Sequence, residues 1–155
     1  MVSYKTASLI STSCQLGSLL SSADQATQDA YRDFGHYLGL AFQVQDDILG
    51  IWGNIMLVGK PVDSDLISRK KSLPVLYGLE KKGQFAQRWN GEQIKPEDVA
   101  GLADQLAVEG GRLFAQESAD QMTDLALLAL RTADPKGDAG EALYDLVSKL
   151  LSREA

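Results

Sequence analysis

The segment from Asp24 to Trp52 limits the possible folds more than any other part of the chain. Mostly apolar side chains return in it every three or four residues, which is the spacing of one face of an α-helix. This face consists of Tyr31, Phe34, Leu38, Ala41, Gln45 and Ile48. Asp24 is a residue type that caps helix N-termini, and Gly53 is a type that ends helices. The segment therefore predicts one long helix with a single buried face.

The remaining sequence favours further helices. The chain has only 4 prolines in 155 residues, and it shows no alternating pattern typical of β-strands. We expect helices over residues 3–21, 73–82, 96–107, 111–131 and 136–153. Glycine, proline and many polar residues interrupt the pattern over residues 53–72, which predicts an extended functional loop. Together these features predict an all-α fold in which residues 1–155 form a single domain.

Two glycines lie four residues apart inside the long predicted helix, at Gly35 and Gly39. A glycine within a helix costs about 1 kcal/mol relative to alanine, so helix formation alone does not favour either residue. Because residues four apart share one face of a helix, both glycines would meet the same neighbour. This spacing predicts that another helix approaches closely there.

Composition and charge exclude several classes of function. The net charge is -6 and the only basic run is Arg69-Lys70-Lys71, so we expect no nucleic-acid partner. One cysteine, Cys14, and one histidine, His36, leave no internal disulfide and disfavour a Cys/His zinc site. No apolar stretch reaches the 18 residues of a membrane span, and the N-terminus shows no signal-peptide pattern. We therefore expect a cytoplasmic protein.

Adjacent carboxylates at Asp46 and Asp47 fall near the C-terminus of the long predicted helix. They repel each other and oppose the helix dipole, and each effect costs on the order of several tenths of a kcal/mol. A bound cation would explain them, since Mg²⁺ commonly joins one or two carboxylates to substrate phosphates. Lys60, Lys70 and Lys71 would neutralise the remaining phosphate charge. Without a ligand, all of these residues would simply be solvated surface.

The order of the polar motifs resembles the second aspartate-rich region of the trans-isoprenyl diphosphate synthases, the polyprenyl synthetase family. The matching motifs are Lys5-Thr6, Phe42-Gln43 with Asp46-Asp47, Gly59-Lys60, Ser64-Asp65-Leu66 and Lys70-Lys71-Ser72-Leu73-Pro74. From residue 75 onward only the helical pattern and the length are similar. The resemblance implies the all-α isoprenoid-synthase bundle, with this chain forming its C-terminal half.

The resemblance also implies a reaction and a set of roles. The family transfers prenyl groups by head-to-tail condensation of isopentenyl diphosphate with an allylic diphosphate, and it uses Mg²⁺. Metal and lysines stabilise the leaving pyrophosphate while an allylic cation forms. By resemblance Asp46 and Asp47 would bind the metal, with Asp46 the principal ligand. Lys5, Thr6, Gln43 and Lys60 would be catalytic and bind substrate, and Phe42 and Lys70 would also bind substrate.

Two departures from the family pattern qualify these expectations. Gly50 stands where the commonest form of this motif has a third aspartate, which predicts a changed metal affinity. The first aspartate motif of the family is absent from the sequence, so we expect this chain to be a truncated half that is inactive alone. Loss of the other half would expose an apolar face, which predicts a homodimer or higher oligomer.

Three other functions remain open at this point. The chain could be a non-catalytic partner subunit of a complete prenyl diphosphate synthase, a relative of the class I terpene cyclases, or a helical interaction module without a metal site. The presence of Asp46, Asp47 and Lys60 favours the enzyme, because a purely structural partner needs no metal site. The Gly-Lys and Lys-Lys-Ser-Leu-Pro motifs favour chain elongation over cyclisation.

Overall fold

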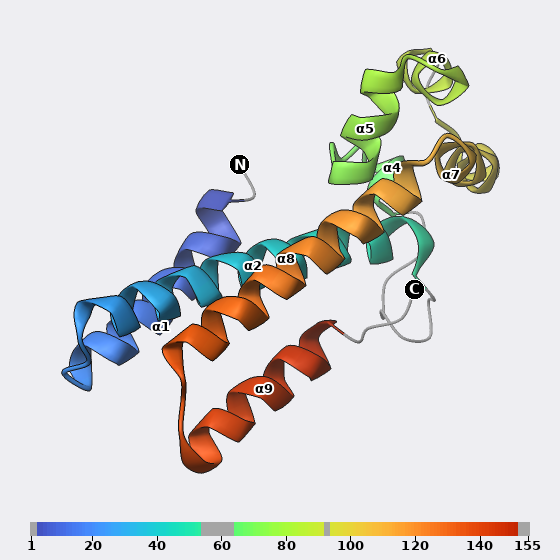
Figure 1. The fold of residues 1–155 in the computed structure, drawn as a ribbon. Helices are drawn as coiled ribbons and strands as arrows, with labels where there is room; N and C mark the ends of the chain where they lie inside the picture. The colour runs from blue at the N-terminus through green and yellow to red at the C-terminus, as the bar shows by residue number, and fades with distance from the viewer. Residues whose placement is uncertain (1–2, 54–63, 92–93, 152–155) are drawn as a thin grey trace. The chain divides into compact units, whose positions relative to one another are not determined.

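The computed structural model describes residues 3–53, 64–91 and 94–151, and within these residues every regular element is helical (Figure 1). The predicted all-α fold is confirmed. The elements are η1 (Ser3–Ala7), α1 (Ser8–Leu20), α2 (Gln25–Trp52), α4 (Ser64–Ile67), α5 (Leu73–Lys81), α6 (Gln84–Asn90), η2 (Pro96–Asp98), α7 (Val99–Val108), α8 (Gly111–Ala133) and α9 (Gly137–Leu151). None of the described helices has both the length and the apolar character that a membrane crossing requires.

The chain divides into two compact units. The first unit comprises Met1–Gln43 and Ser118–Arg153, and the second comprises Val44–Glu117 with Glu154–Ala155. Helices α2 and α8 each contribute residues to both units. The single domain expected from the sequence stays a prediction.

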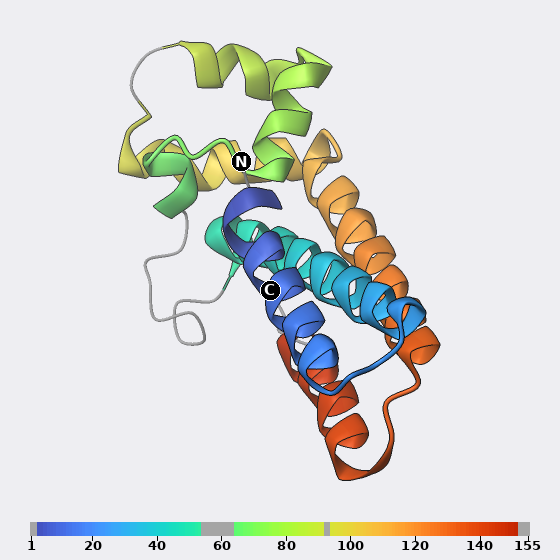
Figure 2. The same cartoon turned by 90° about the vertical axis from the view of Figure 1, so that its left-hand side faces the viewer.

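The core of the first unit joins four helices. Phe34 and Leu38 of α2 pack with Leu130 of α8 and Val147 of α9, and all four side chains are almost fully buried. Ile10 of α1 is partly buried against the same cluster. Burying one large apolar side chain contributes about 1.5–3 kcal/mol, so this cluster stabilises the four-helix arrangement seen in Figure 2.

Helix α1 and the turn before it, η1, approach α2 at the two glycines that the sequence singles out. A Cβ atom at Gly35 would lie 2.7 Å from the Cα of Ser11, and one at Gly39 would lie 2.5 Å from the Cα of Ala7. Real Cβ atoms do not come so close to a backbone, so only glycine permits this packing. The Ser11 hydroxyl also donates a hydrogen bond of 2.8 Å to the carbonyl oxygen of Arg32. The predicted close helix approach is confirmed.

The leucines of α1 lie largely in solvent. The exposed fractions are 69% for Leu9, 51% for Leu16, 53% for Leu19 and 78% for Leu20. The small residues Ala7, Ser11 and Ser18 are buried instead. Because small residues allow close helix contact, they face α2 and leave the leucines outside. We call Leu9, Leu16, Leu19 and Leu20 the α1 leucine patch.

The second unit has its own core, built around the last turn of α2. Ile51 of α2 packs with Leu66 of α4, Val75 of α5, Phe85 of α6 and Leu106 of α7, and all five are buried. The ring centroids of Phe85 and Trp89 lie 5.5 Å apart within the same cluster. Helices α4 to α7 therefore hold the C-terminal end of α2 in a fixed environment.

Most predicted helix boundaries agree with the structure to within a few residues, including those of α2, α5, α8 and α9. Two differences stand out. The predicted loop contains a helical turn, α4, in its second part, while residues 54–63 lie outside the described residues. Helix α6 has no counterpart in the sequence prediction. It is short, and its three buried side chains, Phe85, Ala86 and Trp89, are too few to establish a period.

Candidate functional site

Three carboxylates surround one ammonium group in the second unit. The Nζ atom of Lys70 lies 2.8 Å from Oδ2 of Asp65, 3.1 Å from Oδ1 of Asp47 and 3.7 Å from Oδ2 of Asp46. Asp46 and Asp47 come from the last two turns of α2, and Asp65 comes from α4. We call Asp46, Asp47, Asp65 and Lys70 the carboxylate cluster. The cluster brings together three predicted site residues, Asp46, Asp47 and Lys70, and adds Asp65, to which the sequence assigned no role.

A tight turn after α4 holds Lys70 in this place. The backbone N–H of Lys70 donates to the carbonyl oxygen of Asp65 at 2.9 Å, and that of Arg69 donates to Leu66 at 3.1 Å. Arg69 adopts a left-handed conformation with φ of 53°, which reverses the chain at the end of α4. Its guanidinium donates a hydrogen bond of 2.6 Å to the carbonyl oxygen of Trp89. The turn is therefore held by backbone hydrogen bonds to α4 and by the side-chain hydrogen bond to Trp89 of α6.

The charge of Lys70 is strongly favoured at this position. Partial burial of its ammonium group acts to lower the pKa, because burial disfavours the charged form. Hydrogen bonds to Asp65 and Asp47, together with the negative charges of both residues, outweigh the effect of burial and hold the pKa of Lys70 above its ordinary value. Lys70 is therefore a permanent cation within the carboxylate cluster.

Asp46 and Asp47 differ sharply in their surroundings. Asp47 is 2% exposed, and its Oδ2 accepts a hydrogen bond of 2.9 Å from the backbone N–H of Leu73. Leu73 opens α5, so the carboxylate lies at the positive end of a second helix dipole. The Asp46 side chain is 55% exposed. Lys70 and α5 thus offset the charge of Asp47 within the fold, whereas Asp46 remains accessible from solvent.

Four of the predicted site residues, Lys5, Thr6, Phe42 and Gln43, belong to the first unit. The Thr6 hydroxyl donates to Oε1 of Gln43 at 3.3 Å, which joins η1 to α2. Lys5 is exposed in η1, and Phe42 is half-buried in α2. Lys60, predicted to contact the diphosphate, lies outside the described residues. The structure therefore brings Thr6 and Gln43 together, and their role in catalysis stays a prediction.

The donor set at the end of α2 suits magnesium. Carboxylate oxygens are its usual protein ligands, and it commonly keeps several waters and takes one or two carboxylates plus phosphate oxygens. Among the residues that the structure describes, no three His, Cys, Asp or Glu side chains are arranged to hold a metal ion by themselves. A site completed by a phosphate ligand needs no such trio.

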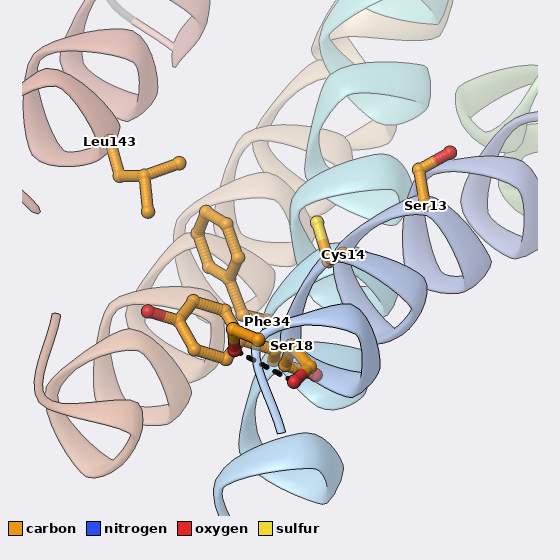
Figure 3. Close-up of a pocket in the computed structure, with 8 residues that line it drawn as sticks. Ser13, Cys14, Ser18, Phe34 and Leu143 are labelled. Atoms are coloured by element: carbon orange, nitrogen blue, oxygen red, sulfur yellow. Dashed lines mark hydrogen bonds between the residues drawn. The ribbon is translucent and has the colours of Figure 1, made fainter. Parts of the chain in front are cut away.

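A cavity of about 250 Å³ in the first unit offers little for comparable chemistry. Ser18 of α1, Phe34 of α2 and Leu143 of α9 are among the residues that line it, together with Cys14 (Figure 3). Burial raises the pKa of the Cys14 thiol, which disfavours the reactive thiolate. None of the predicted site residues lines this cavity. The carboxylate cluster therefore remains the candidate site.

Comparison with known proteins identifies the family of this chain. The family model for polyprenyl synthetase matches residues 1–106. The chain belongs to the polyprenyl synthetase family. It is 37% identical over 164 residues to a (2E,6E)-farnesyl diphosphate synthase of Mycobacterium tuberculosis, covering 100% of this chain and 45% of that protein. It is 41% identical over 138 residues to a geranylgeranyl diphosphate synthase of the same organism, covering 86% of this chain and 39% of that protein.

Solved structures of polyprenyl synthetases share the fold. A polyprenyl synthetase from Streptomyces coelicolor superposes with a TM-score of 0.83 at 31% identity, covering 97% of this chain and 47% of that one. A heptaprenyl diphosphate synthase from Staphylococcus aureus gives a TM-score of 0.86 at 26% identity, covering 99% of this chain and 49% of that one. The predicted family and fold are confirmed. The chain spans less than half the length of these relatives.

The sequence assigns no role to Asp65, although it lies within one of the matched motifs. Its position beside Lys70 is set by the turn after α4, and its position beside Asp47 is set by tertiary packing. The sequence held one signal for Asp65: Gly50 has no side chain, which leaves space beside α2 for a side chain from another element. The sequence alone does not show that this element is α4.

Proposed function

We propose that the chain is part of a prenyltransferase that condenses isopentenyl diphosphate with an allylic diphosphate. The observation that carries the proposal is the meeting of Asp46, Asp47 and Lys70 at one place in a polyprenyl synthetase chain. Farnesyl and geranylgeranyl diphosphate synthases among the relatives support the class of substrate. The part contributed by this chain is a site for one magnesium ion and the diphosphate leaving group.

Asp46, Asp47 and Lys70 of the second unit each have a distinct part in this proposal. Magnesium, when bound, stabilises the negative charge that develops on the leaving diphosphate. Asp46, the exposed carboxylate, would hold the ion, and Asp47 would fix the geometry through its hydrogen bond from Leu73. Lys70 turns its ammonium group toward the diphosphate, where a charge-assisted hydrogen bond forms. Preorganised charge of this kind lowers the barrier to ionisation.

The family resemblance gives roles to residues outside the carboxylate cluster as well. Lys5 of the first unit and Lys60, which lies outside the described residues, would supply further positive charge to the allylic diphosphate. Thr6 and Gln43 hold each other by a hydrogen bond and lie beside the diphosphate and the developing cation. Phe42 lines the pocket for isopentenyl diphosphate. No side-chain nucleophile is needed, because the double bond of isopentenyl diphosphate attacks the allylic cation. The cation formed by this attack then loses a proton, which the released diphosphate takes up.

The chain alone is inactive in this proposal, because it spans less than half the length of its relatives. The α1 leucine patch exposes apolar surface that a partner would cover. We therefore propose a homodimer or higher oligomer for the isolated chain. The same patch keeps one alternative open, in which the chain is a non-catalytic partner subunit of a complete prenyl diphosphate synthase.

A magnesium-dependent prenyl-transfer assay tests the proposal. Isopentenyl diphosphate is incubated with geranyl or farnesyl diphosphate and either the 155-residue chain or the product of the full gene. We expect prenyl transfer only from the longer protein, and we expect Asp46→Ala or removal of Mg²⁺ to abolish it. Asp104→Ala, an exposed site on α7, is the matched control. No transfer by the longer protein, or full activity of Asp46→Ala, would contradict the proposed function.

A further inference from the structure

Arg69 directly precedes Lys70, and its backbone conformation is unusual for its residue type. Its φ of 53° lies in the left-handed region, which is unfavourable for any residue that carries a Cβ atom. Glycine adopts the same conformation without this cost. A strained residue of this kind persists where surrounding contacts hold it in place. The contacts of the Arg69 side chain therefore show what it gains at this position.

The guanidinium of Arg69 contacts the C-terminal end of α6. Its Nη2 donates a hydrogen bond of 2.6 Å to the carbonyl oxygen of Trp89, the last residue but one of that helix. The last carbonyls of a helix have no partner within it and carry partial negative charge, so a cationic donor suits them. The guanidinium carbon also lies 5.7 Å from the centroid of the Trp89 ring. Trp89 is 5% exposed in the core of the second unit, which makes it a rigid partner.

We propose that Arg69 is a positioning residue, which holds Lys70 in place by attaching the turn after α4 to the end of α6. This inference rests on the proposed function, in which the ammonium of Lys70 meets the leaving diphosphate. Arg69 acts on Lys70 through the backbone that the two residues share. Its own side chain bonds to α6, while the next side chain along the chain reaches the carboxylate cluster.

A lysine needs such support more than most residues do. Its side chain has four rotatable carbons and loses much rotamer freedom when its ammonium is held in one place. The Nζ atom of Lys70 nevertheless lies 2.8 Å from Asp65 and 3.1 Å from Asp47, which belong to two different helices. Without the bond to Trp89, the left-handed residue would relax to a commoner conformation. The Lys70 side chain would then leave the backbone in another direction.

The test measures how fast the ammonium protons of Lys70 exchange with water, by ¹H–¹⁵N NMR of the 155-residue chain labelled at lysine. Lys70→Arg identifies the signal. Arg69→Gly accommodates the left-handed conformation but loses the bond to Trp89, so the exchange should become about tenfold faster, the effect of losing one hydrogen bond from a charged group. Arg69→Lys keeps a cation at the end of α6 and should restore most of the protection.

Two controls separate positioning from general stability. Arg131→Ala removes an exposed arginine of α8 and should leave the exchange of Lys70 unchanged. Thermal melting shows whether each variant is folded. If Arg69→Gly proves unfolded, Arg69→Asn takes its place, because asparagine also tolerates the left-handed conformation. Faster exchange at Lys70 in a folded variant, with no change at the exposed Lys82, is the result expected of a positioning residue.

The opposite results are equally specific. Unchanged exchange in the folded glycine or asparagine variant would overturn the inference, because the ion pairs with Asp65 and Asp47 would then place Lys70 by themselves. Exchange in the unaltered chain as fast as that of Lys82 would also overturn it. The measurement needs no catalysis. Slow exchange that depends on Arg69, in a family member whose longer form transfers no prenyl group, would therefore contradict the proposed function and leave the placement of Lys70 intact.

Discussion

The two ends of α2 follow opposite rules. At its N-terminus Asp24 accepts the backbone N–H of Thr27 at 2.8 Å, where a negative charge suits the helix dipole. At its C-terminus Asp46 and Asp47 place two negative charges where the dipole disfavours them. The first part of the helix is arranged for stability. The second part departs from that rule where the candidate site lies, as proteins commonly do at functional sites.

The glycines of α2 show the same contrast. Gly35 and Gly39 adjoin backbone atoms of Ser11 and Ala7, which can move only if a whole helix moves. Gly50 adjoins the carboxylate of Asp65, the end of a side chain that can rotate. One residue type therefore serves helix packing in the first unit and the placement of a charged group in the second.

The largest expected effect on stability is that of replacing Gly39, which lies against the backbone of η1. Gly39→Ala should lower the free energy of unfolding by about 3 kcal/mol, because overpacking forces the backbone of η1 away from α2. Gly50→Ala should cost about 1 kcal/mol, since rotation of Asp65 relieves the contact and alanine favours the helix. Urea denaturation measures both values. Equal losses in the two variants would remove the contrast between the two parts of α2.

The paired aspartates provide the next largest effect. Asp47→Ala should destabilise the chain by about 2 kcal/mol, because the N–H of Leu73 loses its acceptor in a partly buried place. Asp46→Ala should change the free energy of unfolding by less than about 0.5 kcal/mol, because its side chain is largely exposed. Chemical denaturation of the two variants under identical conditions compares them. The contrast fails if Asp46→Ala proves the more destabilising.

Gly17 provides a control for the glycines of α2, because it has no close neighbours. No atom would lie within 4 Å of a Cβ added at Gly17 in α1, so Gly17→Ala should raise the free energy of unfolding by about 0.5–1 kcal/mol. The gain comes from helix propensity alone. A loss of stability in the urea measurement would mean that α1 tolerates less change than its open surface suggests.

The smallest effect concerns the cap at the start of α2. The backbone hydrogen bond from Thr27 lowers the pKa of Asp24 below its ordinary value of 3.8. The charged form is thus preferred in the folded state, and its stabilising contribution is present above that value and lost as pH falls through the lowered pKa. Asp24→Asn should therefore lower the melting temperature slightly at about pH 6 and show a smaller difference at about pH 3. An equal difference at both values would contradict the charge effect.

The sequence was most informative where structure depends on neighbouring residues. Asp24, Gly53 and the spacing of Phe34, Leu38 and Ile48 predicted α2 correctly, because helix period and caps are local properties. The backbone contact of Gly35 and Gly39 was also predictable, since few other reasons place two glycines on one helix face. The partners in that contact were not predictable from sequence.

The remaining features of the site depend on contacts between distant segments. Leu73 lies 26 residues after Asp47, and no local sequence pattern predicts that the N–H of Leu73 donates to that carboxylate. The placement of Asp65 beside Gly50 requires α4, a single helical turn within a segment that reads as a loop. The sequence therefore indicates which residue types the site contains, but not which of them form ion pairs and hydrogen bonds with one another.

Lys70 gives the carboxylate cluster a built-in counterion. A monovalent ion such as Na⁺ or K⁺ that replaced this ammonium would bring no more charge than it removed, and it would lose the directed hydrogen bonds to Asp65 and Asp47. A divalent ion brings twice the charge to the same oxygen atoms. If the cluster binds a metal as proposed, the resident lysine favours a divalent ion over a monovalent one.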